Sequence, residues 1–268
     1  MKKIRPIINE YPLISFVIVA YGFSWGLWWL MVSLTGHINW LGSFGPSLAA
    51  ILLTAIGKGR TGLKSLLAPI GHWRFGPGWY FFVLIGCVLL FLLGLWVFNL
   101  FGGVFDLSGN EVLNQLVQIP LFYLIILIIG GPLGEEVGWR GYILPELLKS
   151  RNGLISSAIL FVIWFAWHLP LYWLPGASQY GSPIVPYMIF FAAWSILFTW
   201  VYLGTSGSLL TALLLHTSIN TYSNFMSGVD SVHADNPFFA YAIASAIFAI
   251  VVLIAYPQMF MRKKSNIA

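Results

Sequence analysis

Six polar side chains stand at three places in a chain that is otherwise strongly apolar, and their types are those of a hydrolytic site. In chain order they are Glu135, Glu136, Arg140, His168, His216 and Asn220. Ionisable side chains are costly inside a lipid bilayer unless they have a partner or a function. Two histidines, a carboxylate and an amide on three separate helices are the groups needed to activate a water molecule against a carbonyl carbon.

The first cluster contains two adjacent glutamates with different expected roles. If residues 133–143 are helical, Glu136 and Arg140 lie four residues apart on one face, and Glu135 lies on the next. Arg140 can then hold Glu136 in an ion pair and leave Glu135 free for water or substrate. A carboxylate without a partner near low-dielectric surroundings suits a general base. The competing interpretation is that all three are solvated loop charges just beyond a membrane span.

The two histidines are less specific signals when each is taken alone. His168 lies in an aromatic run and could simply hydrogen-bond a neighbouring helix. His216 and Asn220 are four residues apart, so they project from the same face of a helix. Such a pair can bind a metal or hold a water molecule, with the Asn220 amide offered to a developing oxyanion. It can equally form polar contacts between helices.

The elements that must position these residues are transmembrane helices. Of the 268 residues, 59% are hydrophobic and 8% are charged, whereas soluble domains carry about 25% charged residues. Stretches long enough to cross a bilayer as helices of about 20 residues occur at 13–34, 39–57, 79–101, 114–134, 154–174, 184–203, 208–225 and 238–260. We therefore expect an all-α, polytopic helix bundle of about eight spans, forming a single membrane domain over residues 1–268.

The basic residues predict how this bundle is oriented. All 13 Lys and Arg residues lie in the termini or in the predicted loops after spans two and four, and the opposite loops contain none. Short cytoplasmic loops carry an excess of Lys and Arg, so both termini are expected in the cytoplasm after an even number of crossings. This asymmetry accounts for the net charge of +5 and gives no reason to expect nucleic acid as a partner.

Three sequence motifs resemble those of the CAAX protease and bacteriocin-processing family, also called the Abi family, which includes the Ras-converting CAAX prenyl endopeptidases. The family's Glu-Glu-x-x-x-Arg motif matches residues 135–140, and its His-x-x-x-Asn motif matches His216 and Asn220. Its Phe-x-x-x-His motif is matched at His168, but Trp164 replaces the phenylalanine. The resemblance extends over about residues 130–222 and leaves the first three spans and the last without an assignment.

The resemblance implies an intramembrane endopeptidase with divided roles in the site. Glu135 would activate water together with His168, while Glu136 and Arg140 would support the site. His216 and Asn220 would stabilise the oxyanion or bind a metal.

The family analogy also raises the question of zinc. His168 and His216 could be zinc ligands with a carboxylate as the third, which would make the enzyme a metalloprotease. Glu135 cannot easily be both a zinc ligand and the general base.

The implied partners are membrane lipids and a peptide or protein substrate, which could carry a lipid at its C-terminus. If Glu135 lies at a cytoplasmic loop edge, the site opens to that side and the substrate enters laterally between helices. Short loops and a compact chain favour a bacterial or archaeal plasma membrane, with peptide maturation or bacteriocin immunity as the setting.

Two other classes of protein could use the same residues. A proton-coupled transporter also places Glu and His inside a helical bundle, although the inverted repeat typical of many transporters is not visible. A non-catalytic membrane scaffold or immunity protein would keep the polar residues for packing alone.

Overall fold

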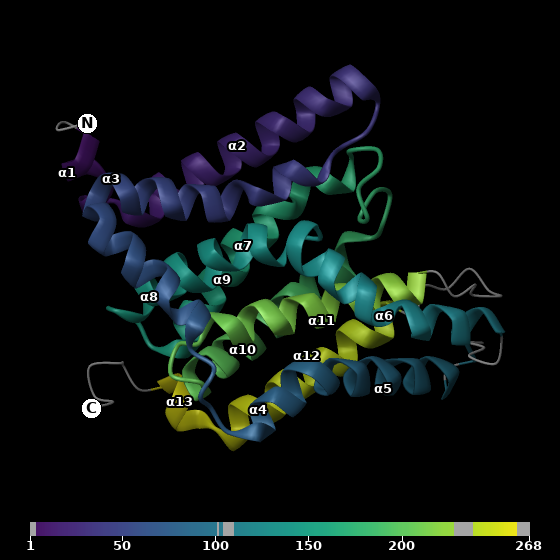
Figure 1. Cartoon of the computed structure of the whole chain (residues 1–268). Coiled ribbons are helices and arrows are strands. Elements are labelled where there is room, and N and C mark those ends of the chain that lie inside the picture. The colour runs from purple at the N-terminus through teal and green to yellow at the C-terminus, as the bar shows by residue number, and fades with distance from the viewer. Residues whose placement is uncertain (1–3, 101, 104–109, 228–237, 262–268) are drawn as a thin grey trace.

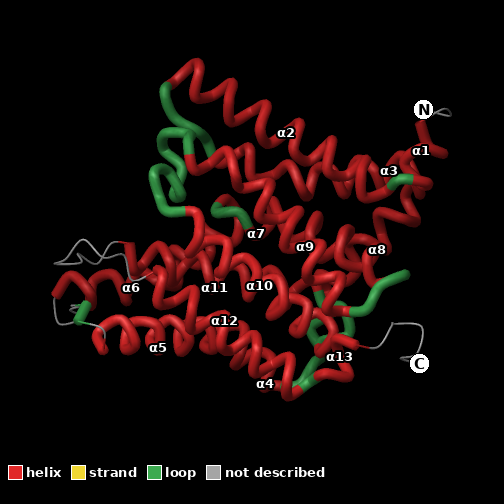
Figure 2. Tube along the Cα trace, turned by 180° about the vertical axis from the view of Figure 1, so that it is seen from behind, coloured by secondary structure: helices red, strands yellow, loops and turns green. Residues whose placement is uncertain are grey.

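The computed structural model describes residues 4–100, 102–103, 110–227 and 238–261, and only the backbone of residues 4, 110–116 and 224–227. Every regular element in these segments is a helix (Figures 1 and 2). The predicted all-α membrane bundle is therefore confirmed.

The helices follow one another along the chain with short connections. The α-helices are α1 (Ile4–Glu10), α2 (Pro12–Thr35), α3 (Gly45–Leu67), α4 (Pro77–Phe81), α5 (Cys87–Leu100), α6 (Asn110–Ile129), α7 (Pro132–Gly138), α8 (Leu144–Leu148), α9 (Gly153–His168), α10 (Ile184–Gly204), α11 (Leu209–Ser227), α12 (Phe238–Ala255) and α13 (Pro257–Met261). Between them lie the 3₁₀ helices η1 (Trp40–Phe44), η2 (Ala68–Gly71) and η5 (Leu169–Tyr172), and the π-helical turns η3 (Phe82–Gly86) and η4 (Trp139–Ile143).

Six of these helical stretches are long and apolar enough to cross a membrane, and α6 joined to α7 and α8 makes a seventh across a bend of 48°. The remaining predicted span corresponds to α11, which carries His216 and Asn220 and packs against α6, α7 and α10. A helix enclosed by other helices can cross a bilayer with polar residues on its surface. The count of eight spans and the cytoplasmic location of both termini stay predictions.

The predicted polar loop at residues 58–78 is partly helical. Helix α3 continues to Leu67 across a kink at Gly59, whose φ of +64° favours glycine. Leu66 is buried in the core, while Arg60 and Lys64 are exposed. The expectation of a loop was wrong because an amphipathic helical turn has too few apolar residues for its mean hydropathy to indicate a helix.

The fourth predicted span, 114–134, does not end in a cytoplasmic loop. The helix breaks at Gly130 and Gly131 and resumes at Pro132, which begins α7 with its preset φ. Gly134 and Gly138 let α7 lie against the start of α3, because a Cβ at either position would come within 2.6 Å of the backbone of that region. The first polar cluster is therefore inside the bundle, and the interpretation as solvated loop charges is wrong.

The two ends of the bundle differ in what they contain. The first and last described helices, α1 and α13, lie at one end, together with the start of α9 (Figure 1). The connections at residues 36–44 and 173–183 lie together at the opposite end in both views (Figures 1 and 2). A hydrogen bond of 3.1 Å from the Ile38 N–H to the Pro175 carbonyl oxygen joins these two connections.

Candidate active site

Glu135 is held by two tryptophans from different helices. Its Oε2 accepts hydrogen bonds from the Trp139 indole at 3.1 Å and from the Trp164 indole at 2.9 Å. The side chain is only 4% exposed. The expectation that Glu135 has no partner was wrong: Trp139 lies one helical turn further along the same segment, and the Trp164 indole becomes apparent only when α9 is packed. Both donors use the same carboxylate oxygen, so they fix the direction of the other oxygen, Oε1.

Glu136 is the acceptor for two cationic or potentially cationic side chains. The expected pair with Arg140 is present, with 2.7 Å between Arg140 Nη1 and Glu136 Oε1. The same oxygen lies 2.6 Å from His216 Nδ1, which comes from α11. Glu136 and Arg140 are completely buried. Sequence spacing predicts the contact within α7, but the contact with a residue 80 positions away had no sequence signal.

Arg140 is enclosed by aromatic rings on α9 and α10. Its guanidinium carbon lies 4.3 Å from the ring centroid of Trp164 and 3.7 Å from that of Phe198. Cation–π contacts of this kind are strengthened when the cation is desolvated. Arg140 therefore ties three helices together and fixes the carboxylate that orients His216. It is a buried structural cation and not one of the loop charges that predict membrane orientation.

Three of the four predicted catalytic side chains converge beside Gly131. A Cβ placed on Gly131 would lie 3.0 Å from Glu135 Oε1, 3.4 Å from Asn220 Nδ2 and 3.9 Å from His216 Nε2. The φ of Gly131 is +109°, a conformation that residues with a side chain rarely adopt. Asn220 also donates a hydrogen bond of 2.8 Å from Nδ2 to the Gly130 carbonyl oxygen. The helix break therefore gives these atoms a common space.

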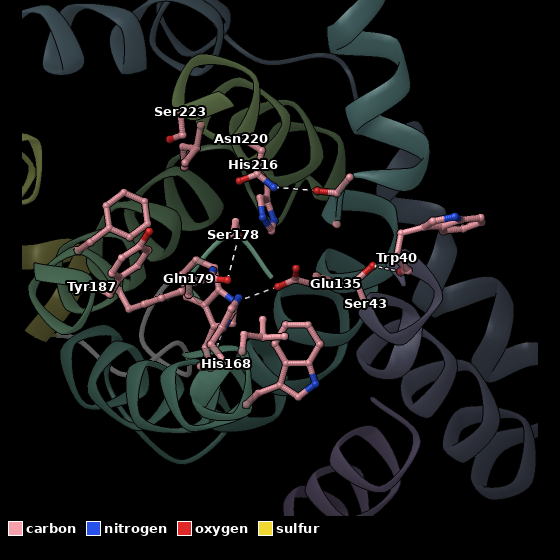
Figure 3. Close-up of a pocket in the computed structure, with 18 of the residues that line it drawn as sticks. Trp40, Ser43, Glu135, His168, Ser178, Gln179, Tyr187, His216, Asn220 and Ser223 are labelled. Carbon is pink, nitrogen blue, oxygen red and sulfur yellow. Dashed lines mark hydrogen bonds between the residues drawn. The ribbon is translucent and has the colours of Figure 1, made fainter. Parts of the chain in front are cut away.

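His168 is the fourth predicted residue and lines the same cavity. Its Nδ1 lies 2.8 Å from the Trp164 carbonyl oxygen, and its ring centroid lies 4.4 Å from that of Phe191. A carbonyl oxygen can only accept, so Nδ1 of His168 carries the hydrogen and Nε2 is the remaining nitrogen. The same reasoning applies to His216, whose Nδ1 faces a carboxylate. Figure 3 shows both rings and Glu135 around one space.

The space has a volume of about 960 Å³, and ten of its 27 described lining residues are Phe, Tyr or Trp. Its deep part is formed by the residues described above, and its outer part by both connections at residues 36–44 and 173–183. Among the described residues that line it, the only ionisable carboxylate is Glu135, and no Lys or Arg is present. A cavity with a few polar groups in an otherwise apolar wall is typical of a binding or catalytic site.

The described residues do not match a catalytic zinc site. Such sites use three protein ligands from His, Cys, Asp or Glu. Within residues 4–100, 102–103, 110–227 and 238–261, no three such side chains are grouped so that they could hold a metal ion. The one carboxylate among the described lining residues, that of Glu135, already accepts two indole hydrogen bonds on Oε2.

Fold and site together define a polytopic membrane protein with an acid–histidine cavity enclosed by its helices. Residues 117–222, which contain all six polar residues, match the family described as type II CAAX prenyl endopeptidase Rce1-like. The chain is also 32% identical over 127 residues to CAAX prenyl protease 2 of Methanococcus maripaludis. These two findings show that part of the chain is similar to proteins described as CAAX prenyl proteases.

A second relative is more distant and has a name that assigns no activity. The UPF0177 protein YxdF of Lactococcus lactis is 25% identical over 120 residues. The alignments cover 45% and 44% of this chain, and 43% and 55% of the two relatives, respectively. The chain thus matches about half of each curated relative.

Proposed function

We propose that this protein is an intramembrane endopeptidase in which Glu135 and His168 activate a water molecule. The observation that carries the proposal is the convergence of Glu135 Oε1, Asn220 Nδ2 and His216 Nε2 within 4 Å of one point beside the cavity. A general base needs hydrogen-bond reach to its water, and an oxyanion needs donors on the other side of the carbonyl. The arrangement supplies both kinds of group.

The reaction can be written with each proton assigned. Glu135 takes a proton from water as the water oxygen bonds to the carbonyl carbon, and Nε2 of His168 accepts a hydrogen bond that orients the water. The oxyanion that forms accepts a hydrogen bond from the Asn220 amide and, when the ring is protonated, from His216 Nε2. Glu135 then returns its proton to the leaving nitrogen as the C–N bond breaks.

Glu136 and Arg140 act as positioning residues in this proposal. The Glu136 carboxylate holds His216 Nδ1, so that Nε2 faces the site. Arg140 pairs with the Glu136 carboxylate inside the bundle and holds it in place. Removing one partner of such a buried pair costs more than the pair contributes, because the other charge is left without compensation.

The proposed substrate is an apolar, uncharged peptide segment. The aromatic walls of the cavity favour such a segment, and a charged side chain would find no opposite charge among the described lining residues other than the catalytic groups. The Methanococcus relative is named a CAAX prenyl protease, and a lipid on the substrate C-terminus would fit the same walls. The proposed location is the plasma membrane of a bacterium or archaeon.

The test is Glu135→Gln in purified protein with a fluorogenic peptide library, with and without a C-terminal prenyl group. The amide oxygen can still accept the two indole hydrogen bonds, so folding is retained while the base is lost. We expect the rate to fall by about 10²–10⁴-fold, the usual contribution of a general base.

The matched control is Glu146→Gln, because Glu146 pairs with Lys149 near the surface and contacts no part of the site. Full activity of Glu135→Gln would contradict the proposal. Absence of cleavage by the wild type with every peptide would favour a transporter or a scaffold.

A further inference from the structure

The exposed positive charges mark one end of the bundle. The described basic residues outside the site are Arg5, Lys58, Arg60, Lys64, Arg74, Lys149 and Arg151. They lie in or beside α1, the end of α3, the segment before α4 and the segment after α8, which all occupy the end where α1 and α13 lie (Figure 1). Two contacts join these segments: the Arg5 side chain donates to the Gly57 carbonyl oxygen at 2.9 Å, and the backbone of Gly153 lies against that of Phe260.

The mouth of the cavity is at the other end. Its rim is formed by the connections at residues 36–44 and 173–183, which contain no Lys, Arg, Asp or Glu. Besides the hydrogen bond between them, Gly176 lies close enough to His37 that a Cβ on the glycine would be 3.3 Å from the histidine ring. Ser178 and Gln179 of this rim line the same cavity as Glu135 and His168 (Figure 3).

The directions of α10 and α11 also place the cavity on the rim side of the bundle. On α10, which runs away from the rim, the early residues Tyr187 and Phe191 line the cavity, whereas the later Phe198 is buried against Arg140. On α11, which runs towards the rim, Asn220 and Ser223 line the cavity.

The path from the site to the basic end is filled. Glu136, Arg140 and Phe198, which do not line the cavity, are almost fully buried between it and that end. The expectation that the site opens to the cytoplasmic side depended on Glu135 being at a loop edge, and Glu135 is instead inside α7. The geometry leaves access from the rim end.

We infer that the catalytic cavity opens on the extracytoplasmic side of the membrane and takes its substrate from there. The basic end faces the cytoplasm by the usual distribution of Lys and Arg, so the uncharged rim faces away from it. That a substrate enters the cavity rests on the proposed function. The side on which the cavity opens can be measured without any peptidase activity.

Cysteine labelling in intact cells tests the side of the opening. The only natural cysteine, Cys87, is fully buried, so the wild type serves as the blank. Ser178→Cys is at the exposed rim, and the matched variant Ser150→Cys is exposed at the basic end. With a membrane-impermeant maleimide, we expect Ser178→Cys to be labelled in intact cells and to lose labelling in sealed inverted vesicles, and Ser150→Cys to show the reverse. The opposite pattern would overturn the inference.

A second measurement tests whether the rim is the entrance. In nanodiscs both faces are accessible, and a bulky polyethylene-glycol maleimide on Ser178→Cys should abolish peptide cleavage relative to the same variant before labelling. The same reagent on Ser150→Cys should leave cleavage unchanged. Full activity of the labelled Ser178→Cys would overturn entry through the rim. If the wild type cleaves no peptide, the proposed function fails while the labelling still decides the side.

Discussion

At the residue scale, Trp164 connects most parts of the site. Its indole N–H donates to Glu135, its carbonyl oxygen faces His168 Nδ1, and its ring stacks on the Arg140 guanidinium. Its ring centroid is also 6.0 Å from that of His216. The CAAX motif that the sequence resembles has phenylalanine at this position, which provides the ring but no N–H. Trp164 is therefore a positioning residue whose hydrogen bond is an addition of this chain.

We predict that Trp164→Phe lowers kcat by roughly tenfold to a hundredfold, while KM changes less. A hydrogen bond to a charged group is worth about 1.5–3 kcal/mol, and a factor of ten in rate corresponds to about 1.4 kcal/mol. The ring and its contact with Arg140 are kept, so the loss comes from a less well-oriented carboxylate. Steady-state kinetics on a cleaved peptide measure the effect.

The matched control for this prediction is Trp200→Phe. The indole N–H of Trp200 has no hydrogen-bond partner in the part of the chain that the structure describes, and its ring packs away from the site against Trp79. An equal fall in kcat for both variants would show that the Trp164 hydrogen bond has no special role.

The sequence predicted one contact within a helix and missed those between helices. The pair of Glu136 and Arg140 follows from a spacing of four residues. Trp139 is also four residues from Glu135, but Glu135 was expected to have no partner. The bond from His216 to Glu136 has no such signal, since it depends on how α11 packs against α7. Residue identity therefore predicted which groups matter, while their partners depend on tertiary packing.

At the scale of elements, the break between α6 and α7 creates the site. Hydropathy predicted the bounds of α2 and α10 within one residue at each end, because these helices are apolar along their whole length. It ended the fourth span before Glu135, since buried polar residues resemble a loop in composition. The structure instead shows a helix interrupted at Gly131 and continued through η4 and α8.

We predict that Gly131→Ala abolishes most activity and lowers the free energy of unfolding by about 1–3 kcal/mol, the usual cost of a residue held in a disfavoured backbone conformation. The new Cβ would also lie 3.0 Å from Glu135 Oε1, which is tighter than ordinary contact. It would occupy the space proposed for the reacting groups. Peptide cleavage and thermal unfolding in detergent measure the two effects.

Gly36→Ala is the control that separates the two effects of Gly131→Ala, which are backbone strain and crowding of the site by the new Cβ. Gly36 has a φ of +79° at the end of α2, and a Cβ there would meet nothing within 4 Å. This variant should lose some stability but keep its peptidase activity. Full activity of Gly131→Ala would place the reacting groups elsewhere in the cavity.

At the scale of the whole molecule, charge and cavity are arranged along one axis. The exposed Lys and Arg residues lie at one end, the uncharged rim at the other, and the buried network around Arg140 between them. Sequence alone predicted the asymmetry of charge, but not on which side of the network the cavity opens. That required the directions of α7, α9, α10 and α11 together.

The orientation of the whole chain depends on whether α11 and the bent pair of α6 with α7 and α8 both cross the membrane. If they do, the six apolar spans become eight, and both termini lie on the same side. We predict that green fluorescent protein fused to either terminus is fluorescent and that alkaline phosphatase fused to either terminus is inactive, because both termini face the cytoplasm. A fusion truncated after Gly36, behind the single helix α2, should export an active phosphatase. Termini on opposite sides would mean an odd number of crossings, and one of these two polar elements would then enter the bundle without spanning the bilayer.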